Sequence, residues 1–177
     1  EQNIDFLSSI LTIPSLSELE SYQSPIDPIS LYHARNSFAN YFANQLKDTL
    51  FELLQKCYFN SKDNWPKGQG ERSLIETIWT LLMYSNNNKN IRREALNSIK
   101  GDSMTLSKGA LNALRITNSE ELNQASDEFY HRWQHNPVVL DTWFELQSSI
   151  PRDDSIDVIK NLLTHEKFDP LAPNSIR

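Results

Sequence analysis

The stretch Leu74-Ile75-Glu76-Thr77-Ile78-Trp79-Thr80-Leu81-Leu82 places apolar side chains at positions 74, 75, 78, 79, 81 and 82. Recurrence at intervals of three and four residues is the period of one face of an α-helix, whereas a half-buried β-strand alternates apolar and polar residues. The stretch therefore predicts an amphipathic helix of about 14 residues. Because strict alternation is scarce elsewhere and glycine occurs only four times, the sequence predicts an all-α protein.

Helical periodicity extends to both sides of this stretch. On the N-terminal side, one apolar stripe with room for a single break runs through Phe38, Phe42, Leu46, Leu50, Leu53 and Cys57. On the C-terminal side, shorter stripes lie within residues 111–114, 122–133, 139–144 and 156–163. We expect about seven to nine helices in total, with the tryptophans at 79, 133 and 143 in core positions.

Prolines mark the helix boundaries. Asp27-Pro28 is an N-cap followed by a proline at the first helical position. Asn136-Pro137 ends one helix and begins the next, because the residue before a proline is disfavoured in the α conformation. Pro151-Arg152-Asp153-Asp154 does the same, with acidic residues at the start of the following helix. The connections are short, so consecutive helices should be antiparallel neighbours.

The longest polar stretches, residues 60–70 and 85–90, are too short to be domain linkers. We therefore expect residues 1–177 to form a single all-α domain of stacked antiparallel helix pairs. Such pairs build a helical-repeat superhelix of the armadillo or HEAT kind, in which packing persists although sequence similarity between repeats is lost.

The composition excludes several classes of protein. A net charge of −6 argues against nucleic-acid binding and against an anionic membrane surface. No apolar run approaches the roughly 20 residues of a membrane span. The single cysteine, Cys57, rules out an internal disulfide and favours a reducing, cytoplasmic location. The polar first residues do not resemble a signal peptide, and the missing initiator methionine suggests a part of a longer chain.

None of the candidate sites for chemistry is complete. His131 and His135 are four residues apart, as in a two-ligand metal clip, but the alternative that they flank a buried tryptophan at a helix end is favoured. His165-Glu166 begins like the zinc motif His-Glu-x-x-His, yet position 169 is aspartate. Cys57 lies on an apolar stripe, where a buried and inert thiol is expected. We predict no catalytic residue and no metal ligand in this chain.

Two weaker patterns are best explained without a ligand. Gly68-Gln69-Gly70 lacks the residues of a phosphate-binding loop and is interpreted as a plain turn. The mild basic cluster Arg92-Arg93, with Lys89 and Lys100, is interpreted as a solvated helix face.

Three stretches, taken in order, resemble a known family. They are Tyr22–Pro28 followed by Leu31, Ala34 and Arg35; Met104-Thr105 followed by Ala110–Leu114; and Trp133, Asn136 and Val138–Gln147, which continue into Leu162-Leu163, His165, Phe168, Pro173-Asn174 and Arg177. In this order they resemble the C-terminal helical domain of bacterial aminopeptidase N, a zinc alanyl aminopeptidase of the gluzincin type. The resemblance covers the chain from about residue 20 to its end.

The chain departs from the family pattern at two places. Ala172-Pro173-Asn174-Ser175-Ile176-Arg177 stands where the family has Asn-Pro-Asn-Arg-x-Arg, and Lys108 replaces a residue that is commonly apolar. The family also continues for several helices beyond the position of Arg177. We therefore expect a superhelix truncated at its C-terminal end, with an exposed apolar strip near residues 159–171 that the following helices would cover.

The resemblance implies a function within a larger enzyme. The domain would be non-catalytic, would cap the active site and would line the channel that admits short peptides, while zinc is bound in the parent's catalytic domain. Its partners would be that catalytic domain and short peptides. Asn174 and Arg177 match the family's Pro-Asn-x-x-Arg element, so they are the candidate channel residues, and Arg177 is suited to hold a peptide carboxylate. The alternative is that Arg177 only braces the next helix.

A second function is consistent with the same sequence pattern. A free-standing helical-repeat scaffold that binds a partner protein on its concave face would have the same helical pattern. Either function requires a folded core, and we expect Trp143 or Phe144 to be buried against the helix that contains Trp133.

Overall fold

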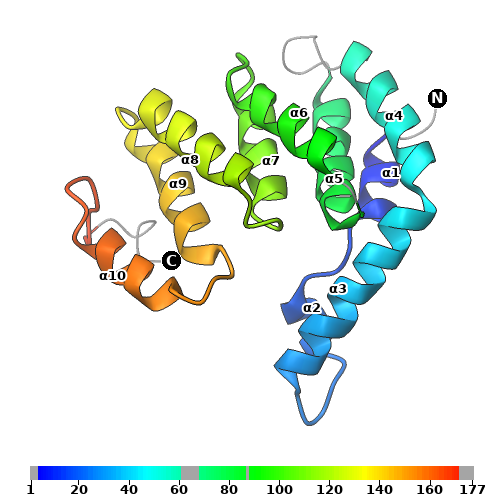
Figure 1. The fold of residues 1–177 in the computed structure, drawn as a ribbon, viewed down its shortest axis with the longest axis horizontal. Helices are drawn as coiled ribbons and strands as arrows, with labels where there is room; N and C mark the ends of the chain where they lie inside the picture. The colour runs from blue at the N-terminus through cyan, green and yellow to red at the C-terminus, as the bar shows by residue number, and fades with distance from the viewer. Residues whose placement is uncertain (1–3, 61–67, 87, 172–177) are drawn as a thin grey trace. The chain divides into compact units, whose positions relative to one another are not determined.

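A computed structural model describes residues 4–60, 68–86 and 88–171, and within these ranges the chain forms ten α-helices and no β-strand (Figure 1). The prediction of an all-α protein is confirmed. The helices are α1 (Ile4–Leu11), α2 (Leu16–Glu20), α3 (Pro28–Gln45), α4 (Lys47–Asn60), α5 (Gln69–Tyr84), α6 (Lys89–Ile99), α7 (Met104–Leu114), α8 (Glu120–Trp133), α9 (Pro137–Ser149) and α10 (Ser155–Leu163). They belong to two compact units, residues 1–91 and 92–177.

Helix α5 is the centre of the first unit. Helices α1, α3 and α4 all pack against it, which explains why α5 is apolar over most of its circumference. The side chains predicted to form its stripe are all buried: Leu74, Ile75, Ile78, Trp79, Leu81 and Leu82. The helix has 16 residues, close to the predicted length.

The long apolar stripe predicted for residues 38–57 is wrong in register over its first half. The helix breaks at Leu46, between α3 and α4, and the residues of α3 that are buried are Ala39 and Ala43. Two small side chains allow α3 to approach α5 closely. Phe38 and Phe42 instead stack on each other on a different face, with ring centroids 5.6 Å apart. In α4 the stripe is nearly correct, since Leu50, Leu54 and Cys57 are buried.

Two short helices precede the first predicted one, so the expected number of seven to nine was too low. Helix α1 packs on α5 at the position of Gly70, where a Cβ atom would lie 3.1 Å from Oδ1 of Asp5 and 3.3 Å from Cγ2 of Ile4. Gly68, the N-cap residue before α5, has a φ of 69°, a conformation that favours glycine. The interpretation of these glycines as a plain turn is thus correct for Gly68, which lies in the turn before α5, and wrong for Gly70, which belongs to α5 and lets α1 approach it.

In the second unit, α7, α8 and α9 pack against one another and α10 packs against α9. The predicted boundary at Asn136-Pro137 is confirmed: Pro137 is the first residue of α9, and the Asn136 side chain accepts a hydrogen bond from the Val139 amide. Asp27 caps α3 in the same way. Buried side chains from these helices include Leu111, Leu114, Leu122, Phe129, Leu140 and Phe144.

The outer face of α10 is apolar and exposed. Ile156, Ile159 and Leu163 recur at helical spacing, and Leu171 follows beyond the helix end. The predicted apolar strip near residues 159–171 is thus present in this chain. Among the described helices, none is long and apolar enough to cross a lipid bilayer.

Candidate functional site

The two residues predicted to reach a peptide channel, Asn174 and Arg177, lie outside the described residues. Their role remains a prediction. The chain segment that leads to them can be followed to Leu171, and it is fastened to α8 and α9 by a cluster of rings around His165.

The His165 cluster brings together side chains from three parts of the second unit. The His165 ring lies 5.6 Å from the ring of Tyr130 on α8, and 5.7 Å and 5.3 Å from those of Trp143 and Phe144 on α9. Phe168 adds an edge-to-face contact with Phe144 at 5.5 Å. Such contacts stabilise a cluster beyond the area that they bury.

Hydrogen bonds define the state of His165 in this cluster. Its Nδ1 accepts a hydrogen bond from the backbone amide of Lys167 (3.1 Å), so this nitrogen carries no proton. The neutral ring then has its proton on Nε2, which donates to the Tyr130 hydroxyl at 3.3 Å. Burial, with a contribution from the Glu166 carboxylate, raises the pKa of Tyr130. A histidine held in this way braces the segment after α10 and is not arranged as a metal ligand or a catalytic base.

The prediction for Trp143 and Phe144 is confirmed. Phe144 is buried, and half-buried Trp143 packs against α8, where its ring lies 4.8 Å from Tyr130 and its Nε1 donates to Ser126 Oγ at 2.9 Å. Gln147 also donates to this hydroxyl. The hydroxyl of Ser126, a buried polar residue of α8, is therefore satisfied by two side chains of α9.

The histidine pair 131 and 135 does not form a metal clip. Helix α8 ends at Trp133, so His135 lies beyond the helix and does not share a helical face with His131; both side chains are exposed. Among the described residues, no three histidine, cysteine, aspartate or glutamate side chains come together to hold a metal ion. Cys57 is buried as predicted, and burial, with a smaller effect of Glu71, raises the pKa of its thiol.

The predicted basic patch is only partly a solvated face. Arg93, Lys89 and Lys100 are exposed, but Arg92 of α6 donates from Nε to the Glu121 carboxylate of α8 at 3.0 Å. Burial opposes ionisation of Glu121, yet hydrogen bonds from its own backbone and from Arg92 hold the pKa of that carboxyl below its usual value. Arg92 thus connects two helices and is not available to a ligand.

An open groove that the sequence analysis did not predict lies between α1, α3 and α5. Its volume is about 280 Å³, and hydroxyl groups from Ser8, Thr12, Ser73, Thr77 and Thr80 line it together with Glu76, Arg35 and Tyr84. Ser8 and Thr77 share a hydrogen bond of 3.0 Å across the α1–α5 contact. The hydroxyls at 73, 77, 80 and 84 follow one face of α5, and this spacing was the signal available in the sequence.

The groove combines these polar groups with the apolar side chains of Leu11, Ile13 and Leu81. Its lining contains no histidine or lysine that could act as a base on a hydroxyl. Arg35 is engaged at its edge, where Nη1 donates to the Tyr84 hydroxyl (2.9 Å) and Nε donates to the Pro14 carbonyl (2.7 Å). The described residues therefore offer packing and polar surfaces but no catalytic constellation.

Comparison with known proteins gives a match over the whole chain. Residues 1–177 match the family described as a domain of unknown function (DUF3458_C) with ARM repeats. The chain is 27% identical over 180 residues to aminopeptidase N of Haemophilus influenzae and 25% identical over 170 residues to that of Escherichia coli. These alignments cover 100% and 96% of the chain but 20% of each relative, so the chain spans about one fifth of their length.

A solved structure agrees with the sequence relatives. The chain is similar to aminopeptidase A of Legionella pneumophila, crystallised in complex with aspartic acid, with a TM-score of 0.85 and 28% identity. The match covers 98% of this chain and 22% of the Legionella chain.

Proposed function

Because the chain belongs to the DUF3458_C family of ARM-repeat domains and is homologous to part of bacterial aminopeptidase N, we propose that it is the non-catalytic C-terminal helical domain of a zinc aminopeptidase. In this proposal residues 1–177 are a single domain of a longer, cytoplasmic chain. The zinc ion and the residues that activate water lie in another domain of that chain, and the enzyme releases N-terminal amino acids from peptides.

The observation that supports this proposal best is the match of nearly the entire chain to about one fifth of an aminopeptidase, in sequence and in fold.

We further propose that this domain caps the active site and lines the peptide channel. Asn174 and Arg177 are the residues proposed to face the channel, with the Arg177 guanidinium holding the carboxylate of a short peptide. The His165 cluster supports the role indirectly, because it anchors the chain just before these residues to α8 and α9.

The test uses the full-length protein. Arg177→Ala should raise KM for short peptides about tenfold or more, the loss expected for a charge-assisted contact, while kcat for a chromogenic single-residue substrate stays nearly unchanged. Arg93→Ala, which removes an exposed arginine of α6, is the matched control and should change neither value. An equal loss on both substrates, or no loss on either, would show that Arg177 is only structural.

A further inference from the structure

Helix α2, the connection that follows it and the first turns of α3 form an arm, residues 15–34, at one end of the first unit. Helix α2 packs against α3, and the arm extends away from α1, α4 and α5 (Figure 1). All ten residues from Ser21 to Ser30 are exposed. The arm therefore contributes little to the core of its own unit.

The arm is nevertheless well ordered by local hydrogen bonds. Ser15 and Glu18 form a reciprocal capping box at the start of α2, and the Asp27 carboxylate caps α3 through the Ser30 amide at 3.1 Å. The Asp27 amide in turn donates to Gln23 Oε1 at 3.2 Å. At the base, Arg35 connects Pro14 to Tyr84 of α5. An exposed segment held in one conformation loses little entropy when it binds.

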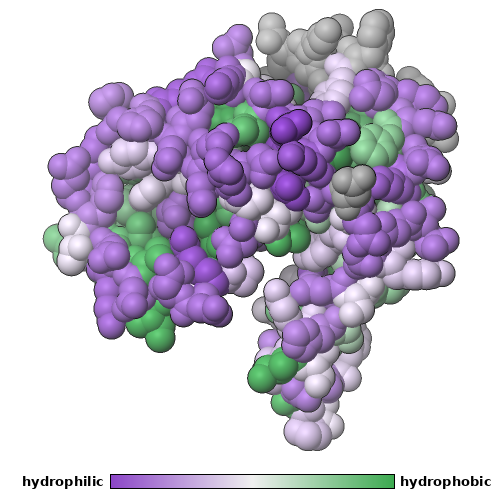
Figure 2. Space-filling view, viewed as in Figure 1, coloured by the Kyte–Doolittle hydropathy of each residue, from purple (hydrophilic) through white to green (hydrophobic). Residues whose placement is uncertain are grey.

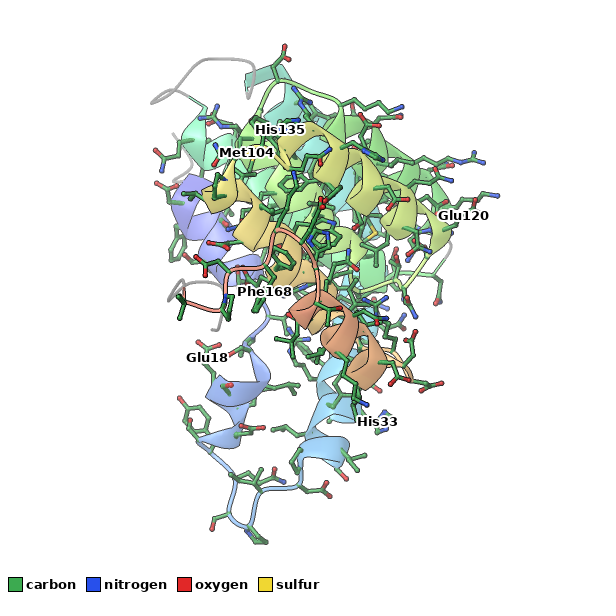
Figure 3. The ribbon with its side chains drawn as sticks, turned by 90° about the vertical axis from the view of Figure 1, so that its left-hand side faces the viewer. Glu18, His33, Met104, Glu120, His135 and Phe168 are labelled. Atoms are coloured by element: carbon green, nitrogen blue, oxygen red, sulfur yellow. The ribbon has the colours of Figure 1, made fainter. Side chains whose placement is uncertain are left out.

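The surface of the arm is apolar at its end and acidic around it. Tyr22 is 88% exposed and Ile29 is 72% exposed, and Ile26 lies between them in the chain. Hydrophobic side chains are visible on the outside of the arm in Figure 2, and Figure 3 labels Glu18 on α2 and His33 on α3, the two limbs of the arm. Residues 15–34 contain three carboxylates, those of Glu18, Glu20 and Asp27, and no lysine or arginine.

The stretch Tyr22–Pro28 is also one of the three by which the sequence resembles aminopeptidase N. The other two contribute buried side chains, such as Leu111 and Phe144, to the second unit, whereas none of the residues 22–28 is buried. The packing of this chain thus gives no reason for an apolar, ordered stretch at that place.

We propose that the arm docks against the part of the aminopeptidase chain that lies outside residues 1–177, with its apolar end in a hollow rimmed by lysine and arginine. The inference rests on the proposed function, since it requires a longer parent chain. The relatives are about five times as long as this chain, so most of the surface available for docking lies outside it. A second copy of this chain is a poor partner, because its net charge of −6 would repel the acidic arm.

Hydrogen exchange in the full-length protein tests the docking directly. The backbone amides of Ser24 and Ile26 have no hydrogen-bond partner within the described residues and lie in an exposed stretch. In an undocked arm they should exchange at nearly the rate of an unfolded chain. We expect exchange at both amides to be slowed at least tenfold in the native full-length protein. Exchange at the unfolded rate would overturn the proposal.

A matched pair of variants tests whether the apolar end is responsible. Ile29 and Val138 occupy the same position, the second residue of a helix that begins with a capped proline, and they are 72% and 76% exposed. Serine is tolerated there, because the first amides of a helix lack helical partners. Ile29→Ser should reduce the protection at Ser24 and Ile26 about tenfold or more, as expected for loss of a buried isoleucine side chain. Val138→Ser should leave it unchanged, and equal effects would overturn the proposal.

Two further measurements distinguish this proposal from its alternatives. Measuring zinc content and aminopeptidase activity on the same full-length preparation tests the parent function independently, so an active zinc enzyme with an unprotected arm would overturn the docking alone. Protection that disappears on dilution, together with a dimeric mass, would assign the arm to a second copy and would also overturn the proposal.

Discussion

Phe144 is the residue whose burial best accounts for the order of the second unit. Only 6% of its surface is exposed, and its ring lies 5.3 Å from those of Trp143 and His165 and 5.5 Å from that of Phe168. The last two residues follow α10, so one side chain of α9 holds the C-terminal part of the unit in place.

Truncation of Phe144 should therefore be costly. We expect Phe144→Ala to lower the free energy of unfolding by about 3–5 kcal/mol, because it removes transfer free energy and leaves a cavity. Phe38→Ala is the control, since Phe38 is 54% exposed, and it should cost less than about 1 kcal/mol. Urea unfolding of both variants measures the difference; similar losses for the two would show that the assigned burial is wrong.

Glu18 gives a pH-dependent prediction at the residue scale. Hydrogen bonds from the Ser15 hydroxyl and amide, both 2.7 Å, lower the pKa of the Glu18 carboxyl. Because the folded pKa lies below the unfolded value of about 4.3, the stabilisation is present above that pH and is lost as the pH falls through the folded pKa.

Hydrogen exchange of the α2 amides measures this stabilisation. The rate in Glu18→Ala is divided by the wild-type rate at the same pH, because this ratio removes the pH dependence of intrinsic exchange. The ratio should exceed one at pH 7 and should approach one as the pH falls through the folded pKa of Glu18. Glu20→Ala leaves the capping box intact and should give a ratio near one throughout. A ratio for Glu18→Ala that does not depend on pH would contradict the role of the carboxylate.

At the scale of elements, helix α3 shows how small residues determine packing. Ala39 and Ala43 are fully buried where α3 meets α5, while the aromatic pair Phe38 and Phe42 is directed elsewhere. Enlarging Ala43 should force the two helices apart or push side chains out of their rotamers.

We expect Ala43→Leu to destabilise the protein by about 1–3 kcal/mol. Ala34→Leu makes the same change on the exposed side of α3 and should be within about 0.5 kcal/mol of the wild type. Thermal or urea unfolding distinguishes the two. If Ala43→Leu were neutral, α3 would not lie against α5 as described.

Strong local signals were sufficient to predict most helices and two of their caps. The apolar stripe at residues 74–82 follows from the helical spacing of its apolar residues, and the boundary at Asn136-Pro137 follows from the steric effect of proline. Both effects act within a few residues. The buried face of α3 was predicted wrongly because its burial depends on the close approach of α5. The spacing of bulky apolar residues in the sequence carries no information on such an approach. Helices α1 and α2 are 8 and 5 residues long, too short for a reliable period.

The candidate site was less predictable than the fold. The absence of a complete catalytic motif could be recognised from residue types, whereas the groove between α1, α3 and α5 depends on helices far apart in the sequence. Arg35 was noted only as part of a resemblance, because its partners Pro14 and Tyr84 are brought near it by the fold. The channel residues Asn174 and Arg177 rest on the resemblance alone.

At the scale of the whole molecule, two exposed surfaces agree with the proposal that the chain is part of a larger protein. The exposed face of α10, with Ile156, Ile159 and Leu163, and the acidic arm at residues 15–34 are both surfaces that an isolated domain would not need. They are expected in a domain that packs against the rest of its own chain, as ARM repeats do against their neighbours.

The most direct test of this account is metal content and aminopeptidase activity, measured side by side on the full-length protein and on residues 1–177 alone. We predict that the full-length protein retains about one zinc per chain after dialysis and cleaves an aminoacyl anilide until a chelator removes the metal. Residues 1–177 alone should retain no stoichiometric zinc and cleave nothing. Zinc retained at one equivalent by residues 1–177, or a full-length protein without aminopeptidase activity, would contradict the assignment.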